Sequence, residues 1–229
     1  MDIYTACIHS ERIHSVSDLI LYRDDSLIVC EKPVGVSSES PGLPELIAGE
    51  AGARVWPVHR LDLGTGGVMV FAFSAGCCAS LQRLFQGNEV SKEYLAVICG
   101  CPDESSGCMK DLLWHDRTRN KTYVVDRMRK GVKEALCEWE TVSSVTLDGQ
   151  ALTLVRVRLH TGRTHQIRVQ FASRGYPLAG DRKYGAPVRA DTVALWASGI
   201  SFPHPDRKSG AVSVRSAPPD VFPWKLFSL

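Results

Sequence analysis

The stretch WPVHRLDLGTGGVMVFA, residues 56 to 72, places a single acid, Asp62, between basic side chains and an apolar run. His59 and Arg60 precede the acid, and glycines follow it before GVMVFAFS (67–74), which is apolar on both faces. Such a run is typical of a central strand that is buried on both sides. The stretch therefore predicts that Asp62 lies on a turn at the edge of a central strand. Taken alone, the same pattern also fits an ordinary turn or cap aspartate.

The composition is that of an ordinary globular chain. Its 229 residues are 44% hydrophobic and 23% charged, which excludes disordered and fibrous classes. No repeat, low-complexity segment or long linker divides the sequence, so we expect one domain over residues 1–229. No window approaches the roughly 20 apolar residues of a membrane span, and MDIYTACIHSERIHS at the N-terminus lacks the pattern of a signal peptide. These features favour a cytosolic protein.

The net charge of +2 hides two basic stretches. Residues 155–189 carry eight Lys and Arg against one acid, Asp181, and residues 115–133 carry seven against two Asp. Clustered cations favour a polyanionic partner because they displace counterions from phosphates. On charge alone, a solvated basic surface fits equally well.

The eight cysteines show no disulfide or zinc pattern. They form C-C and C-x-C pairs, and no C-x-x-C occurs. Several stand in apolar runs, so we expect buried, reduced thiols. Cys101 and Cys108, which bracket a loop rich in Gly, Ser and Pro, are the remaining candidates for a metal site.

Periodicity predicts the secondary structure. SAGCCASLQRLFQGN (74–88) has helical spacing and ends near Gly87. In TLVRVRLH (153–160) Val and Leu alternate with Arg and His, which predicts an apolar inner face and a basic outer face. The other expected strands are LIVCEKP (27–33), KEYLAVICG (92–100), ALCEWETV (135–142) and a closing hairpin of VALWASGISF (193–202) with AVSVRS (211–216).

A second helix is expected in THQIRVQFASRG (164–175), with Thr164 as its cap. Its first turn is crowded by Arg163, His165 and Arg168. Free N–H groups and the helix dipole favour an anion at that end, so cations there add donors to an anion site at a cost in helix stability. The arrangement requires an acidic partner, and Asp62 is the expected one.

Three motifs, HRLD (59–62), KEYLA (92–96) and TGRTHQIR (161–168), together resemble the RluA-like family of RNA pseudouridine synthases. Related stretches stand in the family's order, so the resemblance covers about residues 20 to 220; they are EKPVG (31–35), DLGTGGVMVFA (62–72), GYPLAGDRKYG (175–185) and FPHP (202–205). The chain differs in having TGG after the acid, where the family commonly has TSG. It is also expected to have no N-terminal S4 RNA-binding domain.

The resemblance implies an α+β fold of the pseudouridine synthase type. It has a mixed, mostly antiparallel sheet with flanking helices and a central basic cleft. The implied activity is isomerisation of specific uridines to pseudouridine in ribosomal or transfer RNA, without cofactor or metal. The implied partner is structured RNA, and we expect a monomer with no membrane or obligatory protein partner.

Two other functions are alternatives to this one. A metal-dependent phosphodiesterase or nuclease fits less well, because the three motifs hold no cluster of metal ligands. An RNA-binding protein that has kept the fold and lost the chemistry is the other alternative. Binding alone requires none of the three residues that the family uses for catalysis.

The resemblance also assigns roles to individual residues. Asp62 is the catalytic aspartate, Arg168 is its salt-bridge partner, and Tyr94 stacks on the flipped base and later helps to move a proton. Whether Asp62 adds to the base or acts at the ribose stays open. The residues expected to bind or position RNA are Arg60, Lys92, Arg163, His165 and Gln166. For His165, a structural hydrogen bond to the backbone near the helix start is as good an interpretation as a phosphate contact, and the same choice stays open for His59.

Overall fold

A computed structural model describes residues 15–87, 89–206 and 209–229. The chain forms two compact units: residues 1–92 with 197–218, and residues 93–196 with 219–229. It passes from the first unit to the second within β5 (Ser91–Cys99) and returns within β10 (Leu195–Pro203). The expectation of one catalytic domain stays a prediction.

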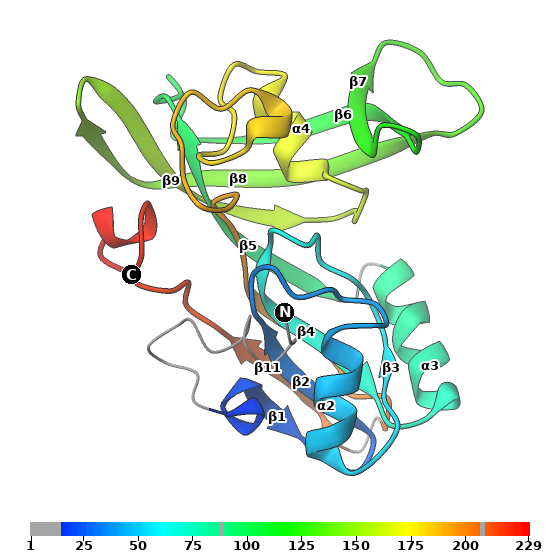
Figure 1. The fold of residues 1–229 in the computed structure, drawn as a ribbon. Coiled ribbons are helices and arrows are strands. Elements are labelled where there is room, and N and C mark those ends of the chain that lie inside the picture. The colour runs from blue at the N-terminus through cyan, green and yellow to red at the C-terminus, as the bar shows by residue number, and fades with distance from the viewer. Residues whose placement is uncertain (1–14, 88, 207–208) are drawn as a thin grey trace. The chain divides into compact units, whose positions relative to one another are not determined.

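The first unit contains a sheet with β4 in its interior (Figure 1). Every residue of β4 is buried, which confirms the central strand expected from GVMVFAFS. The strand β2 pairs with β4 in antiparallel register from Leu27 opposite Ala72 to Lys32 opposite Gly67. The hydrogen-bonded order is β1 (Ile20–Arg23), β2 (Leu27–Lys32), β4 (Gly66–Ala72) and β10, with β11 (Ala211–Arg215) on β10 and β3 (Trp56–Pro57) on β4.

Two helices of the first unit pack on alternating residues of β2 and β4. The helix α3 (Ala75–Gln86) packs Leu81 into the cluster that contains Val29 and Val70. The helix α2 (Leu43–Ala51) packs in the cluster that contains Ile28 and Met69. Successive strand side chains point to opposite faces, so the two helices cover opposite faces of the sheet. The expected helix ending near Gly87 is confirmed, whereas α2 and the short 3₁₀ helix Val16–Leu19 were not anticipated.

The glycine at position 67 is required by a close approach of two strands. Its φ is +109°, and a Cβ placed there would lie 2.3 Å from the Ala197 carbonyl oxygen. Both the left-handed backbone and the lack of space favour glycine over any L residue. The second glycine of TGG is therefore fixed by packing of β4.

The second unit contains five strands and one short α-helix (Figure 1). Val155 and Val157 of β9 are buried in one cluster with Phe171 of α4 (Gln166–Ala172). Arg158 alternates with them and is exposed, which confirms the apolar and basic faces expected for this strand. The hydrogen-bonded order of its strands is β5, β9 (Gln150–Leu159), β8 (Val132–Leu147), β6 (Ser106–Asp116) and β7 (Lys121–Val125). Two 3₁₀ helices, Arg182–Tyr184 and Trp224–Leu226, come after α4 in the chain.

The helix α4 is shorter than expected and is capped differently. It begins at Gln166 and ends at Ala172, and its N-cap is His165 in a left-handed conformation (φ 54°). The carbonyl of Thr164 instead accepts a hydrogen bond of 2.8 Å from the Thr122 hydroxyl. The Thr164 cap was wrong because a tertiary contact, rather than the local sequence, uses this residue.

The described residues confirm an α+β class of fold, with mostly antiparallel strands and three α-helices. None of the helices in the described ranges is long and apolar enough to cross a bilayer. The seven cysteines from Cys30 to Cys137 are free thiols, and four of them are buried. Within the same ranges no group of three or more His, Cys, Asp or Glu residues could hold a metal ion, so Cys101 and Cys108 do not form part of one.

Candidate functional site

Asp62 lies on a tight turn of the first unit. Its carbonyl accepts the Thr65 N–H at 3.0 Å, and β4 begins directly after Thr65. Leu61, the residue before it, exchanges two hydrogen bonds with the Ser38 hydroxyl, at 2.7 and 3.0 Å. Leu63, the residue after it, accepts the Gly35 N–H at 2.9 Å. Loop 33–42 therefore fixes the backbone on both sides of the carboxylate.

A fully buried lysine completes this attachment. The Nζ atom of Lys32 donates to the carbonyls of Pro33 at 2.9 Å, Val36 at 2.8 Å and Leu63 at 3.4 Å. Burying an ammonium group is unfavourable unless its donors are satisfied. Lys32 thus joins loop 33–42 to the turn of Asp62, a role that sequence reasoning missed although EKPVG was part of the resemblance.

Lys32→Met is expected to destabilise the protein by about 1.5–3 kcal/mol, because the three backbone carbonyls that accept hydrogen bonds from the charged ammonium group lose their donor. Urea unfolding followed by circular dichroism measures this change. Lys225→Met, which removes an exposed lysine, serves as the control and should leave the midpoint unchanged. Equal midpoints for both variants would contradict the role of Lys32.

His59 has a structural role. Its Nε2 atom accepts the Val70 N–H at 3.1 Å, and its ring stacks on Phe85 with centroids 4.8 Å apart. Burial, followed by the nearby charge of Lys92, lowers the pKa of His59 to about 3. The imidazole is therefore neutral and accepts a backbone hydrogen bond, so the structural alternative holds for this residue.

His59 should make the fold sensitive to acid. Its pKa is about 3 in the folded state against 6.5 for a free histidine, so the unfolded state binds the proton first as the pH falls. This contribution to stability is complete above pH 6.5 and is lost progressively between pH 6.5 and pH 3. His59→Gln, which can still accept from Val70, should flatten the dependence of the unfolding free energy on pH. Parallel curves for the two proteins would contradict this.

The neighbouring Arg60 is exposed. Its Nη1 atom pairs with Glu39 Oε1 at 2.9 Å, and both side chains are exposed. Exposed pairs of this kind contribute little to stability. The RNA contact expected of Arg60 stays a prediction.

Tyr94 and Lys92 both lie on β5 and are half-buried. Tyr94 belongs to the second unit and packs against the cluster that contains Val157 and Ile98. Lys92 is the last residue of the first unit before the crossing. The roles expected for these two side chains stay predictions.

Arg168 is bound by a buried acid. Its Nε donates to Asp181 Oδ2 at 2.6 Å and its Nη2 donates to Asp181 Oδ1 at 2.9 Å. Arg168 is 8% exposed and Asp181 is completely buried. Asp62 belongs to the other unit, so the expected pair of Asp62 with Arg168 stays a prediction. Asp181 was missed, although its position as the one acid in a basic stretch was a usable signal.

The other basic and polar residues of TGRTHQIR bond within the second unit. Arg163 Nε donates to the Glu134 carbonyl at 2.8 Å. Gln166 is buried, and its Oε1 accepts from the Thr161 hydroxyl and the Arg163 N–H. These bonds give Gln166 a structural role in the loop before α4, while contacts of either residue with RNA stay predictions.

His165 is also bonded inside the second unit. It is 8% exposed, and its Nδ1 lies 3.0 Å from the Tyr184 hydroxyl. The partner of this histidine is thus a side chain, whereas the structural alternative expected the backbone. Binding of RNA by His165 stays a prediction.

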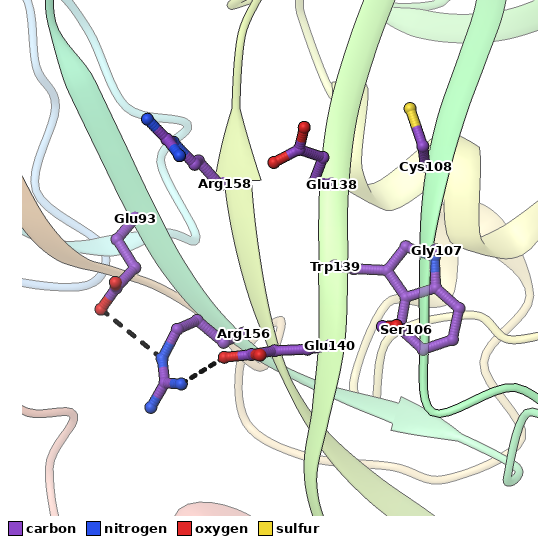
Figure 2. Close-up of a pocket in the computed structure, with 9 residues that line it drawn as sticks. All are labelled: Glu93, Ser106, Gly107, Cys108, Glu138, Trp139, Glu140, Arg156 and Arg158. Carbon is purple, nitrogen blue, oxygen red and sulfur yellow. Dashed lines mark hydrogen bonds and ion pairs between the residues drawn. The ribbon is translucent and has the colours of Figure 1, made fainter.

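A pocket of about 470 Å³ opens on the second unit (Figure 2). Figure 2 shows Arg156 between Glu93, at 3.7 Å, and Glu140, to which it is hydrogen-bonded. The walls carry three carboxylates and two guanidinium groups, so the pocket has no strong net charge. It is lined by Glu93, Ser106, Gly107, Cys108, Glu138, Trp139, Glu140, Arg156 and Arg158, none of which is an expected catalytic or RNA-binding residue.

The geometry defines two preformed elements: a carboxylate on a fixed turn and a buried, acid-bound arginine. Residues 26–173, which include Asp62, Tyr94 and Arg168, match the RNA pseudouridylate synthase family. The chain therefore belongs to this family.

Individual proteins agree with this assignment. The chain is 32% identical over 200 residues to the dual-specificity RNA pseudouridine synthase RluA of Escherichia coli K12, covering 82% of this chain and 87% of that protein. It is 35% identical over 206 residues to an uncharacterized RNA pseudouridine synthase of Mycobacterium bovis, where 81% of this chain spans 65% of the relative's length. The structure of human RNA Pseudouridylate Synthase Domain Containing 1 matches with a TM-score of 0.77 and 24% identity, over 91% of this chain and 87% of that one. This likeness confirms the pseudouridine synthase fold.

Proposed function

We propose that this protein is an RNA pseudouridine synthase. Membership of the family over residues 26–173 carries the proposal, because that region contains all three residues to which the resemblance gives catalytic roles. The fixed turn of Asp62 and the buried position of Arg168 support it, since catalytic groups work best when their neighbours hold them in place. The alternative, a binding protein without activity, gives no reason for Asp62, Tyr94 and Arg168 to occur together.

In the proposed reaction, the target uridine is isomerised without gain or loss of atoms. Asp62 acts as nucleophile, the bond between ribose C1′ and base N1 breaks, and the base turns. A bond then forms between C1′ and C5, the C5 proton leaves and N1 gains a proton. Arg168 is proposed to pair with the Asp62 carboxylate, and Tyr94 to stack on the base after it leaves the RNA helix.

The proposed substrate is structured RNA, either ribosomal or transfer RNA. The basic stretches 115–133 and 155–189 support it through phosphate contacts, which set register without reading sequence. Arg60, Lys92, Arg163, His165 and Gln166 are the proposed contacts or supports. We further propose that the protein acts in the cytosol as a monomer.

The test is to map pseudouridine in cellular RNA with and without the protein, and then to restore it with purified protein. We expect defined uridines to lose the modification in its absence and to regain it on incubation. Restoration should persist in excess EDTA, because the proposed chemistry uses no metal. No change at any uridine would contradict the function, and loss of activity with EDTA would contradict the mechanism.

Tyr94→Phe should retain RNA binding and lose turnover, because the ring that stacks on the base remains while the hydroxyl that moves a proton is removed. The measurement is single-turnover pseudouridine formation together with the RNA dissociation constant. Tyr22→Phe, on β1 and outside both basic stretches, is the control. Wild-type turnover in Tyr94→Phe would show that the hydroxyl has no chemical role.

A further inference from the structure

The buried carboxylate of Asp181 binds one edge of the Arg168 guanidinium. It uses the Nε and Nη2 atoms, at 2.6 and 2.9 Å. A guanidinium group is planar and carries five N–H donors in a fixed fork. A bidentate bond on the Nε edge therefore fixes the plane of the group and the direction of its outer edge, which consists of Nη1 and Nη2.

The ring of Tyr184 lies against the same guanidinium. The Arg168 Cζ atom is 5.2 Å from the ring centroid, a cation–π distance. The Tyr184 N–H also donates to Asp181 Oδ1 at 3.3 Å. Arg168 is thus held at one edge by a carboxylate and at one face by a ring, and both come from the segment GDRKYG (180–185).

Tyr184 is in turn fixed by three polar contacts of its hydroxyl. It accepts the Thr122 N–H at 2.9 Å, donates to the Thr122 carbonyl at 3.2 Å and lies 3.0 Å from His165 Nδ1. Burial raises the pKa of Tyr184, so its hydroxyl stays protonated and able to donate. The ring therefore connects Arg168 rigidly to β7 and to the start of α4.

We propose that Asp181 and Tyr184 are positioning residues for the isomerase reaction, holding the Arg168 guanidinium so that its outer edge is presented to the carboxylate of Asp62. This inference rests on the proposed function. Asp181 also offsets the arginine's charge, so Arg168 acts through the direction of its hydrogen bonds more than as a free cation for RNA phosphate.

The test compares Asp181→Asn with wild type in turnover and in RNA affinity. Asn cannot accept both N–H groups, so Arg168 is released from its fixed plane, and a misplaced catalytic contact lowers kcat by about 10²-fold. The RNA dissociation constant should stay within about threefold or become tighter, because a negative charge is removed. A loss that appears only as weaker RNA binding would contradict the positioning role.

The matched control is Asp111→Asn. Asp111 accepts two bonds from Arg174 in the same unit, at 2.9 and 3.1 Å, and lies outside the proposed machinery. It should keep kcat at the wild-type level while losing a bidentate ion pair of the same chemical type that is partly exposed. Equal losses of kcat in the two variants would show a merely structural role and overturn the proposal.

Tyr184 provides a second variant should Asp181→Asn fail to fold. Tyr184→Phe keeps the ring against Arg168 and should lower kcat less than Tyr184→Leu, which removes it. NMR of the arginine Nε–H groups provides a measurement that does not depend on activity. The Arg168 Nε–H proton should be protected from exchange with solvent in wild type and should exchange faster in Tyr184→Leu. Inactive wild-type protein would reject the proposed function, whereas active wild type with fully active Asp181 and Tyr184 variants would reject this inference alone.

Discussion

Asp62→Asn is expected to abolish pseudouridine formation, by at least about 10⁴-fold, while RNA binding is unchanged. The amide has nearly the same shape and preserves the turn, because the turn depends on the backbone and on Ser38, Gly35 and Lys32. It cannot act as a nucleophile. The measurements are pseudouridine yield by mass spectrometry and an RNA dissociation constant.

The outcome of this experiment separates the two functions. An exposed aspartate of the same unit, Asp25, provides the control, and Asp25→Asn should be as active as wild type. Product from wild type and Asp25→Asn only, with equal binding by all three, fits an enzyme. Binding by all three with no product from any of them fits a protein that has lost the chemistry.

Arg168→Ala is expected to lower the free energy of unfolding by about 3–5 kcal/mol, because it leaves the carboxylate of Asp181 buried without its partner. It is also expected to abolish turnover, because the proposed partner of the Asp62 carboxylate is removed. Arg174→Ala is the control, since its pair with Asp111 is partly exposed and should cost about 1 kcal/mol or less. Urea unfolding gives the stabilities, and single-turnover assays give the activity.

A double substitution separates the two effects of Arg168. Arg168→Met combined with Asp181→Leu removes both charges and fills the space with apolar atoms, which often restores the stability of a buried pair. We expect stability to return in part while pseudouridine formation stays absent. Wild-type turnover in Arg168→Ala would contradict the proposed role of the arginine.

Most elements of the fold could be predicted because their signals are local. The alternation of Val155 and Val157 with arginines marks a strand with two different faces, and the spacing around Leu81 marks a helix that ends at Gly87. Burial of all seven residues of β4 follows from an uninterrupted apolar run. The family could also be recognised, since its motifs are short and stand in order along the chain.

The start of α4 could not be predicted from the same kind of signal. Thr164 is a good capping residue, yet its carbonyl bonds to Thr122 and the helix begins two residues later. Two hydrogen bonds from distant segments, those of Thr122 and Tyr184, set the conformation at Thr164 and His165. Tertiary contacts of this kind override local capping preferences.

By itself, the sequence determined the helix at 75–86, the family, the identity of the candidate catalytic residues and the strands β2, β4, β5, β8, β9, β10 and β11, but not β1, β3, β6 or β7. Only the tertiary structure decided which partners the polar side chains take: Asp181 for Arg168, three carbonyls for Lys32 and the Val70 amide for His59. The physical reason is the distance along the chain over which each signal acts. The periodic pattern of burial depends on neighbouring residues in the sequence, whereas a buried charge or donor is satisfied by a distant segment that folding brings within hydrogen-bond distance.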